Sequence, residues 1–137
     1  MVVETAVGAP AYTEKELEIL AIIIYQEAGG DACSDKTRQM VGEVFLNRVA
    51  DPRFPDTIEA VALAKGQYGR LYWTGIKWPD RAVNPGEAHA VERAYKMAQA
   101  LLDGSVDRLL PTDTIFQAEF KQGTEVVAHM DGFYFCR

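Results

Sequence analysis

The chain has 137 residues, enough to bury one sizeable core and too few for two ordinary domains. Hydrophobic residues make up 48% of it and charged residues 25%, a globular composition that excludes an intrinsically disordered chain. Its net charge of −6 argues against non-specific binding to nucleic acid or to anionic membranes, because both need basic surfaces.

Residues 1–12 are expected to form a short extension before a single domain over residues 13–137. The start lacks the basic region of a secretory signal, and Glu4 interrupts its only short apolar run. No stretch approaches the roughly 20 apolar residues of a membrane span. We therefore predict neither a signal peptide nor a membrane span, and the export route stays open.

The first predicted helix occupies residues 13–30 and carries the strongest signals in the chain. Thr13 and Glu16 have the spacing of a capping box. The residues that follow, Leu17–Ile24, are almost all apolar, and a helix that is apolar all round belongs in a core. Gly29 and Gly30 are expected to end the helix in left-handed conformations.

Glu27 lies in the last turn of this helix, on the same side as Ile23 and Ile24. The negative end of the helix dipole and removal from water both disfavour a carboxylate there. Both effects raise the pKa of a carboxyl group, as a general acid near neutral pH requires. The alternative is a solvated glutamate at a fraying helix end.

A second helix is predicted over residues 35–50, with Ser34 as its N-cap. Its apolar stripe consists of Met40, Val41, Val44, Phe45 and Val49. Glu43 points away from this stripe and is expected to be solvated. Asn47 and Arg48 fit either of two roles, tying down a loop or contacting a substrate.

Pro52 and Pro55 end the second helix, and Asp56 with Glu59 is expected to cap a short helix through about residue 64. Residues 65–83 then lack helical or strand periodicity. A functional loop and a disordered segment are the two explanations for such a stretch.

Four aromatic residues favour the functional loop, because disordered segments are poor in aromatics. They are Tyr68, Tyr72, Trp73 and Trp78. Aromatic rings with polar tips suit a sugar-binding groove. The competing view is that the rings cover the core, and at least two of them are expected to do so.

The last third of the chain changes from helix to strand. Asn84, Pro85 and Glu87 are expected to start a helix that ends at Gly104, with His89 exposed. Three strands follow within residues 114–120, 125–129 and 133–136. Gln122-Gly123 and Asp131-Gly132 suit the hairpin turns between them.

The expected fold is therefore α+β and mostly helical, with about four helices and a small antiparallel sheet near the C-terminus. Cys33 and Cys136 are expected to be unpaired thiols, although a disulfide between them is possible. His89 and His129 stand at no recognisable ligand spacing, so we expect no metal site and no cofactor.

Four motifs, in order and at compatible spacing, resemble the cell-wall hydrolases of the spore-cortex-lytic (SleB/CwlJ-like) type. The resemblance runs from about residue 17 to residue 135. The matching residues are Tyr25, Glu27 and Ala28; Gly42 to Val49; Pro52, Phe54, Pro55, Thr57 and Ile58; and Gly66, Gln67 and Tyr68.

The resemblance implies a lysozyme-like fold that acts on the glycan strands of peptidoglycan. It implies that Glu27 is the catalytic residue of a lytic transglycosylase, which forms 1,6-anhydromuramyl ends without a second carboxylate. The expected substrate contacts, from the motifs and from the aromatic loop, are Gln67, Tyr68, Tyr25, Tyr72 and Trp73. Action on the bacterial wall or spore cortex, as a monomer, is expected.

One family element departs from its pattern near the C-terminus. The family commonly shows Gly-x-His-x-Phe, and alignment on Phe135 puts Asp131 at the glycine and Phe133 at the histidine. His129 is out of register. A different substrate preference is therefore expected if that histidine shapes the groove.

Other functions stay open at the level of sequence. A hydrolytic muramidase would need a base, for which Glu43, Asp31 and Asp35 are the candidates. A peptidoglycan-binding or structural module could keep the fold without turnover. Amide-bond cleavage of the stem peptide is disfavoured, because neither a zinc site nor a paired nucleophile and base is evident.

Overall fold

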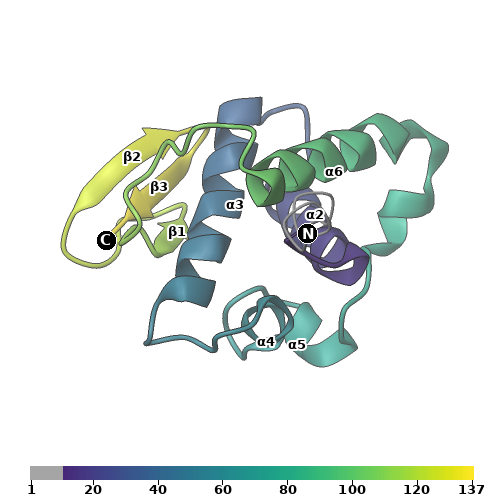
Figure 1. Cartoon of the computed structure of the whole chain (residues 1–137). Helices are drawn as coiled ribbons and strands as arrows, with labels where there is room; N and C mark the ends of the chain where they lie inside the picture. Colours follow the sequence, from purple (N-terminus) through teal and green to yellow (C-terminus); the bar gives the residue numbers. More distant parts are fainter. Residues whose placement is uncertain (1–10) are drawn as a thin grey trace, which may run out of the picture.

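The computed structural model describes residues 11–137, so most of the extension predicted at residues 1–12 lies outside the described residues. In this part of the chain, helices pack around a central helix and a small sheet lies to one side (Figure 1). The helices are α2 (Glu14–Ala28), α3 (Asp35–Ala50), α4 (Ile58–Leu63), α5 (Leu71–Thr74) and α6 (Ala88–Asp103), with 3₁₀ turns at Asp80–Val83 and Pro85–Glu87. The predicted α+β, mostly helical fold is confirmed.

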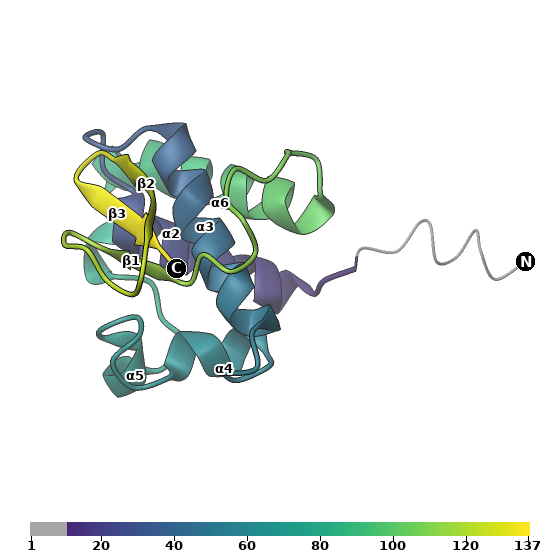
Figure 2. The same ribbon diagram turned by 90° about the vertical axis from the view of Figure 1, so that its left-hand side faces the viewer.

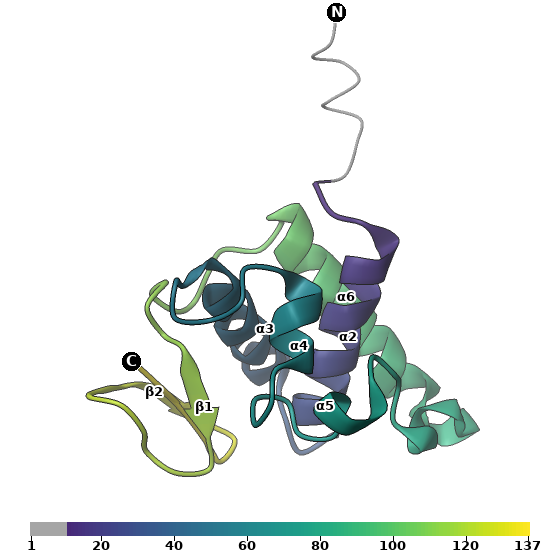
Figure 3. The same cartoon turned by 90° about the horizontal axis from the view of Figure 1, so that it is seen from below.

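Helix α2 is the central element, and α3, α4 and α6 all pack against it. Seen from below, α4 covers the neighbouring α2 and α3 (Figure 3). The predicted capping box is present, since the Thr13 hydroxyl accepts from the Glu16 amide at 3.1 Å and the Glu16 carboxylate accepts from the Thr13 amide at 2.9 Å.

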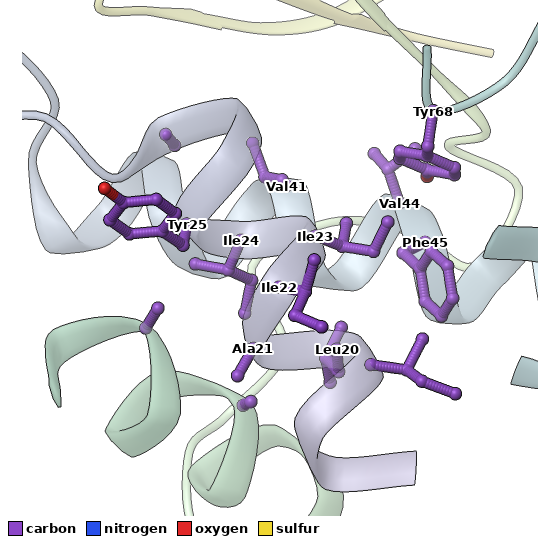
Figure 4. Close-up of a cluster of buried hydrophobic side chains, with 14 of the residues drawn as sticks. Leu20, Ala21, Ile22, Ile23, Ile24, Tyr25, Val41, Val44, Phe45 and Tyr68 are labelled. Carbon is purple, nitrogen blue, oxygen red and sulfur yellow. The ribbon is translucent and has the colours of Figure 1, made fainter. Parts of the chain in front are cut away.

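Seven consecutive residues of α2, Ile19–Tyr25, are each at most 1% exposed. Their side chains point around the whole circumference of the helix (Figure 4). Ala21 faces α6, whereas Ile23 is directed toward Val44 and Phe45. Full burial of one such aliphatic side chain stabilises the fold by about 1.5–3 kcal/mol, so α2 is the main source of hydrophobic stabilisation.

Gly42 sits where α3 approaches both α2 and α6. A Cβ atom at this position would lie 2.4 Å from Leu101 Cδ1 and 3.2 Å from Ile24 Cδ1. A contact of 2.4 Å is shorter than real Cβ atoms show, so a larger residue would displace the Leu101 side chain and crowd Ile24. The glycine in the Gly42–Val49 motif is therefore a packing requirement.

The helix ends differ from expectation in two places. Gly29 and Gly30 are not left-handed: Gly29 has φ −73°, and Gly30 is not among the glycines with positive φ. The α2 carbonyls are bonded by arginine side chains instead, as described below. Gly104 does close α6 in the left-handed conformation, with φ 71°.

Two helix starts also differ from the prediction. The N-cap of α4 is Thr57 and not Asp56, because its hydroxyl accepts from the Ala60 amide at 3.1 Å. Asn84 makes no side-chain cap. Its carbonyl accepts from the Glu87 amide at 2.9 Å, so the chain forms a 3₁₀ turn before α6 begins.

The aperiodic segment at residues 65–83 is ordered and contains a fifth helix that the sequence did not predict, the four-residue α5. Tyr68 is 1% exposed and Trp78 packs against the core, so two of the four aromatics do cover the core, as expected. Tyr72 and Trp73 on α5 are 43% and 78% exposed.

The sheet lies beside α3 (Figure 2) and consists of β1 (Phe116–Ala118), β2 (Val126–Met130) and β3 (Phe133–Cys136). The strand order is β1-β3-β2, and all pairs are antiparallel. Asp131 and Gly132 have φ of 51° and 84° and form the predicted tight turn between β2 and β3. Gln122-Gly123 is not a hairpin turn, because β1 pairs with β3.

The prediction that Glu43 is solvated is wrong, because the residue is fully buried. Its carboxyl group accepts from the backbone amides of Leu109 at 2.9 Å and Leu110 at 2.8 Å, and from the Gln39 side chain at 2.8 Å. A wall that the periodicity of α3 could not show, the segment after α6, covers this side of the helix.

Asn47 and Arg48 hold the same segment, in agreement with the first of their two expected roles. The Asn47 side chain donates to the carbonyls of Pro111 at 3.1 Å and Thr114 at 3.0 Å. Arg48 Nε donates to the Ile115 carbonyl at 2.7 Å. Both residues tie the segment that leads into β1 to α3.

Three further findings concern the described residues. No helix within residues 11–137 is long and apolar enough to cross a bilayer. The same residues hold no cluster of three or more His, Cys, Asp or Glu side chains that could bind a metal ion. Cys33 and Cys136 are both free thiols, with Cys136 buried.

Replacing Glu43 with alanine should lower the free energy of unfolding by about 3 kcal/mol, because two backbone amides in the interior lose their acceptor. Denaturant unfolding monitored by circular dichroism measures the change. The exposed Glu59, which pairs with Lys15, is the matched control, and Glu59→Gln should stay within about 0.5 kcal/mol of the wild type. An unchanged midpoint for Glu43→Ala would contradict the assigned role.

Candidate active site

Glu27 lies in the last turn of α2 and is held by two glutamine side chains. Gln26 Nε2 donates to Glu27 Oε2 at 3.1 Å, and also to the Tyr68 carbonyl at 3.0 Å. Gln117 Nε2, on β1, donates to Glu27 Oε1 at 3.3 Å. The carboxyl group is therefore fixed between the helical part of the molecule and the sheet.

The pKa of Glu27 is raised above the usual range, chiefly because burial removes the carboxylate from water. The hydrogen bond from Gln26, the charge of Arg48 and the hydrogen bond from Gln117 act in the opposite direction. Glu27 is thus kept protonated to higher pH by its surroundings while three groups are in place to stabilise its charged form.

Burial has a larger role here than the helix dipole, which the sequence analysis also invoked. Two arginines occupy the C-terminal end of α2: Arg38 donates to the Ala28 carbonyl at 3.1 Å, and Arg93 donates to the Gly29 carbonyl at 2.7 Å. Their positive charges offset the negative end of the dipole.

Three buried polar atoms around Glu27 have no hydrogen-bond partner among the described residues. They are Gln26 Oε1, Gln117 Oε1 and the Tyr68 hydroxyl. Burial raises the pKa of Tyr68, so its hydroxyl is a donor at neutral pH. Buried polar groups are rarely left unpaired, and a cluster beside one carboxyl group is typical of a site that binds a polar ligand.

Each glutamine partner of Glu27 lines a hollow, whereas Glu27 itself lines neither of the two. Gln117 lines a hollow of about 300 Å³ between the sheet and the loop that holds Gln67. Gln26 lines a second hollow of about 430 Å³ beside Arg70 and Arg81. Glu27 is therefore connected to both hollows by its hydrogen bonds to Gln26 and Gln117.

Of the five substrate contacts expected from the sequence, Gln67 lines one of these hollows directly. Tyr68 lies beneath the site, with its carbonyl bonded to Gln26 and its ring 5.2 Å from the Arg48 guanidinium. These two residues are brought together with Glu27.

The other three expected contacts are placed elsewhere. Tyr25 is 1% exposed, its hydroxyl donates to Glu87, and the Arg81 guanidinium lies 4.9 Å from its ring. The ring therefore presents no face to a sugar. Tyr72 and Trp73 pack edge to face on α5, with ring centroids 4.9 Å apart, and line neither hollow.

Gln26 and Gln117 are residues of the candidate site that the sequence analysis missed, and Arg48 is one for which it left contact with a substrate open. Gln26 is the middle residue of the Tyr25–Glu27 motif, so its position beside Glu27 was visible. Gln117 could not be placed, because only the sheet order brings β1 next to the end of α2.

The candidate bases for a hydrolytic mechanism are all occupied elsewhere. Asp31 pairs with Arg93 at 3.0 Å, Asp35 pairs with Arg38 at 2.9 Å, and Glu43 binds the backbone amides described above. Within the described residues, the groups that act on Glu27 are two glutamines and an arginine. None of them is a second carboxyl group.

Comparison with known proteins gives three matches. The sequence model of the cell wall hydrolase family matches residues 33–133. Over 87 residues the chain is 31% identical to the spore cortex-lytic enzyme of Halalkalibacterium halodurans, an alignment that covers 59% of this chain and 26% of that enzyme. The chain thus spans about a quarter of the length of that relative.

The third match is structural. The crystal structure of the catalytic domain of the Bacillus cereus SleB protein superposes with a TM-score of 0.66 at 19% identity, covering 93% of each chain. At this identity the match shows a shared fold. The family match begins after Glu27, so the case for that residue rests on its geometry.

The resemblance to cell-wall hydrolases of the spore-cortex-lytic type is confirmed by these matches. The family model covers well over half of the residues, from the loop after α2 to the start of β3. The chain belongs to the cell wall hydrolase family.

Proposed function

We propose that this protein cleaves the glycan strands of peptidoglycan by a lytic transglycosylase mechanism, with Glu27 as general acid and then general base. The observation that carries the proposal is that Glu27, whose pKa is raised by burial, is hydrogen-bonded to two glutamines that each line a hollow. Membership of the cell wall hydrolase family supports the substrate class.

In the first step Glu27 donates its proton to the bridging glycosidic oxygen, and the bond to the anomeric carbon of the muramyl residue breaks. Positive charge develops on that sugar ring while Glu27 becomes a carboxylate. Gln26, Gln117 and the charge of Arg48 stabilise this carboxylate, because each of them favours the ionised form.

In the second step the Glu27 carboxylate accepts the proton of the 6-hydroxyl of the same muramyl residue. The 6-oxygen bonds to the anomeric carbon and closes a 1,6-anhydro ring, and Glu27 returns to its protonated form. The substrate supplies its own nucleophile, so no second carboxyl group is needed to activate water.

Hydrolysis of the same bond is the alternative outcome. It normally requires a second carboxyl group about 5–9.5 Å from the first. Among the described residues, none of the three candidate acids is a group that acts on Glu27: the exposed Asp31 and Asp35 form ion pairs with arginines, and Glu43 binds backbone amides. This observation favours ring closure over attack by water.

The proposed place of action is the bacterial wall or the spore cortex, and the proposed partner is the glycan strand itself. Gln67, Gln117 and the unpartnered Tyr68 hydroxyl are the proposed contacts for sugar hydroxyls around the scissile bond. The exposed Tyr72 and Trp73 remain a proposed platform for a more distant sugar.

Glu27→Gln should lower the rate of release of soluble fragments from purified peptidoglycan by a factor of about 10²–10⁴, because the amide cannot transfer the proton. Mass spectrometry of the fragments released by the wild type should show anhydromuramyl ends, which are one water lighter than hydrolysed ends.

Glu59→Gln, on the exposed side of α4, is the matched control and should retain full activity. Hydrolysed ends from the wild type would replace ring closure with a muramidase mechanism. Full activity of Glu27→Gln would remove Glu27 from its role. Binding to insoluble wall without any release of fragments would indicate a non-catalytic module.

Glu27 should also make stability depend on pH. Its pKa is higher in the folded state, so its contribution to stability is complete below the ordinary glutamate pKa of about 4.3 and is lost as pH rises through the folded pKa. Glu27→Gln removes this loss. The variant should therefore unfold at higher denaturant concentration than the wild type at pH 7, with the difference shrinking toward pH 4. A constant difference across this range would contradict the raised pKa.

A further inference from the structure

The hollow beside Gln26 is lined by three cationic side chains, Arg70, Lys77 and Arg81, and one anionic side chain, Asp80. The chain as a whole carries a net charge of −6. A local excess of positive charge on an acidic protein, next to the candidate acid, calls for a physical explanation because it repels itself in the absence of an anion.

Of the three cations in this hollow, Arg70 has the fewest interactions with acidic side chains. Its guanidinium donates to the Lys77 carbonyl and to Thr74 Oγ1, but it forms no ion pair among the described residues. Its Nε is buried and has no hydrogen-bond partner there. Burial lowers the pKa of Arg70, the negative charge of Asp80 opposes this effect, and the positive charge of Arg81 adds to it.

The other two cations are only partly neutralised. Lys77 Nζ lies 3.6 Å from Asp80, and both side chains are more than half exposed, so this pair is weak. Arg81 lies 3.8 Å from Glu87, which also accepts from the Tyr25 hydroxyl, and its guanidinium covers the Tyr25 ring. Tyr25 thus supports Arg81, which lines this hollow.

Gln26 connects this hollow to the chemistry. Its side chain lines the hollow, its Nε2 donates to Glu27, and its Oε1 is buried without a partner. A group bound against Arg70 is therefore adjacent to the bond on which Glu27 acts. The hollow on the opposite side, next to Gln117, has only Arg48 as a cation, and Arg48 is committed to a backbone carbonyl.

We propose that the hollow formed by Gln26, Arg70, Lys77 and Arg81 binds a carboxylate carried by the lactyl side group of the muramyl residue, an inference that rests on the proposed function. A planar guanidinium forms paired hydrogen bonds to a carboxylate. Peptidoglycan carries such a carboxylate on the stem peptide that is attached to the lactyl group, or on the lactyl group itself where the stem peptide is absent, because the lactyl carboxyl is otherwise bound in an amide. The hollow thereby selects muramyl strands that bear an anion and sets which sugar lies on that side of Glu27.

The test compares three walls from one preparation: intact peptidoglycan, peptidoglycan whose carboxylates are converted to neutral amides with carbodiimide and ethanolamine, and amidase-treated strands that keep only the lactyl carboxylate. The wild type should cleave intact wall about tenfold faster, in kcat/KM, than neutralised wall, because charge-assisted hydrogen bonds are lost. Cleavage of amidase-treated strands at the neutralised rate assigns the bound carboxylate to the stem peptide, whereas cleavage at or above the intact rate shows that the lactyl carboxylate freed by the amidase binds in its place.

Arg70→Gln and Lys77→Gln should bring the ratio of intact to neutralised rates close to one. Lys77 is the second variant because its side chain is 60% exposed and its replacement does not threaten folding. Lys96, an exposed lysine on α6 that also pairs with an acidic residue, supplies the matched control, and Lys96→Gln should keep the wild-type ratio. The proposal is overturned if the wild type cleaves intact and neutralised wall at the same rate, or if both variants keep the wild-type ratio of these rates. In either case the protein still cleaves peptidoglycan.

Failure of the proposed function can be distinguished from failure of the carboxylate site, because the wild type would then release no fragments from any of the three wall preparations. Co-sedimentation of Glu27→Gln protein with intact and neutralised wall supplies a measurement that needs no turnover. Stronger binding to intact wall, lost in the double variant with Arg70→Gln, supports the carboxylate site. Equal binding to both walls overturns it.

Discussion

The burial of α2 on all sides is the constraint on which the rest of the structure depends. Ile19–Tyr25 have no exposed face, so α3, α4 and α6 must all pack against them. A helix held in this way has no freedom to rotate or slide, and its last turn is fixed with it. Glu27 is in that turn. The same packing that stabilises the molecule therefore also sets the position of the candidate acid and removes it from water.

A second set of contacts brings the sheet to that acid. Three polar residues along α3, Glu43, Asn47 and Arg48, bind backbone groups between residues 109 and 115, the segment that precedes β1. Buried side chains that bond to main chain in this way specify one path for a segment without regular structure. The path ends at Gln117, whose side chain meets Glu27. The interior polar residues of α3 thus act at a distance on the site, through the course of the backbone.

The sequence predicted the long helices, the capping box at Thr13 and the turn at Asp131-Gly132, because these depend on residues close together in the chain. It also singled out Glu27 and Gln67, which the structure brings into one region. Prediction failed where distant segments decide the outcome. Glu43 was placed in solvent because the segment that covers it cannot be seen from the periodicity of α3, and Gln117 was overlooked because the order of the strands is not written in their local sequence. Tyr25 has the aromatic ring and polar tip that suit contact with a sugar, yet packing against Trp78 and Arg81 buries it.

The strand order has a consequence for how the protein folds during its synthesis. The middle strand, β3, is the last of the three to leave the ribosome, and neither β1 nor β2 has a neighbour to pair with until it arrives. Throughout translation the helices can collapse around α2 while the side that carries Gln117 stays unassembled. A nascent or prematurely terminated chain would then hold its acid without the opposing strand. The strand order alone thus keeps the candidate acid apart from its partner on β1 until the chain is complete.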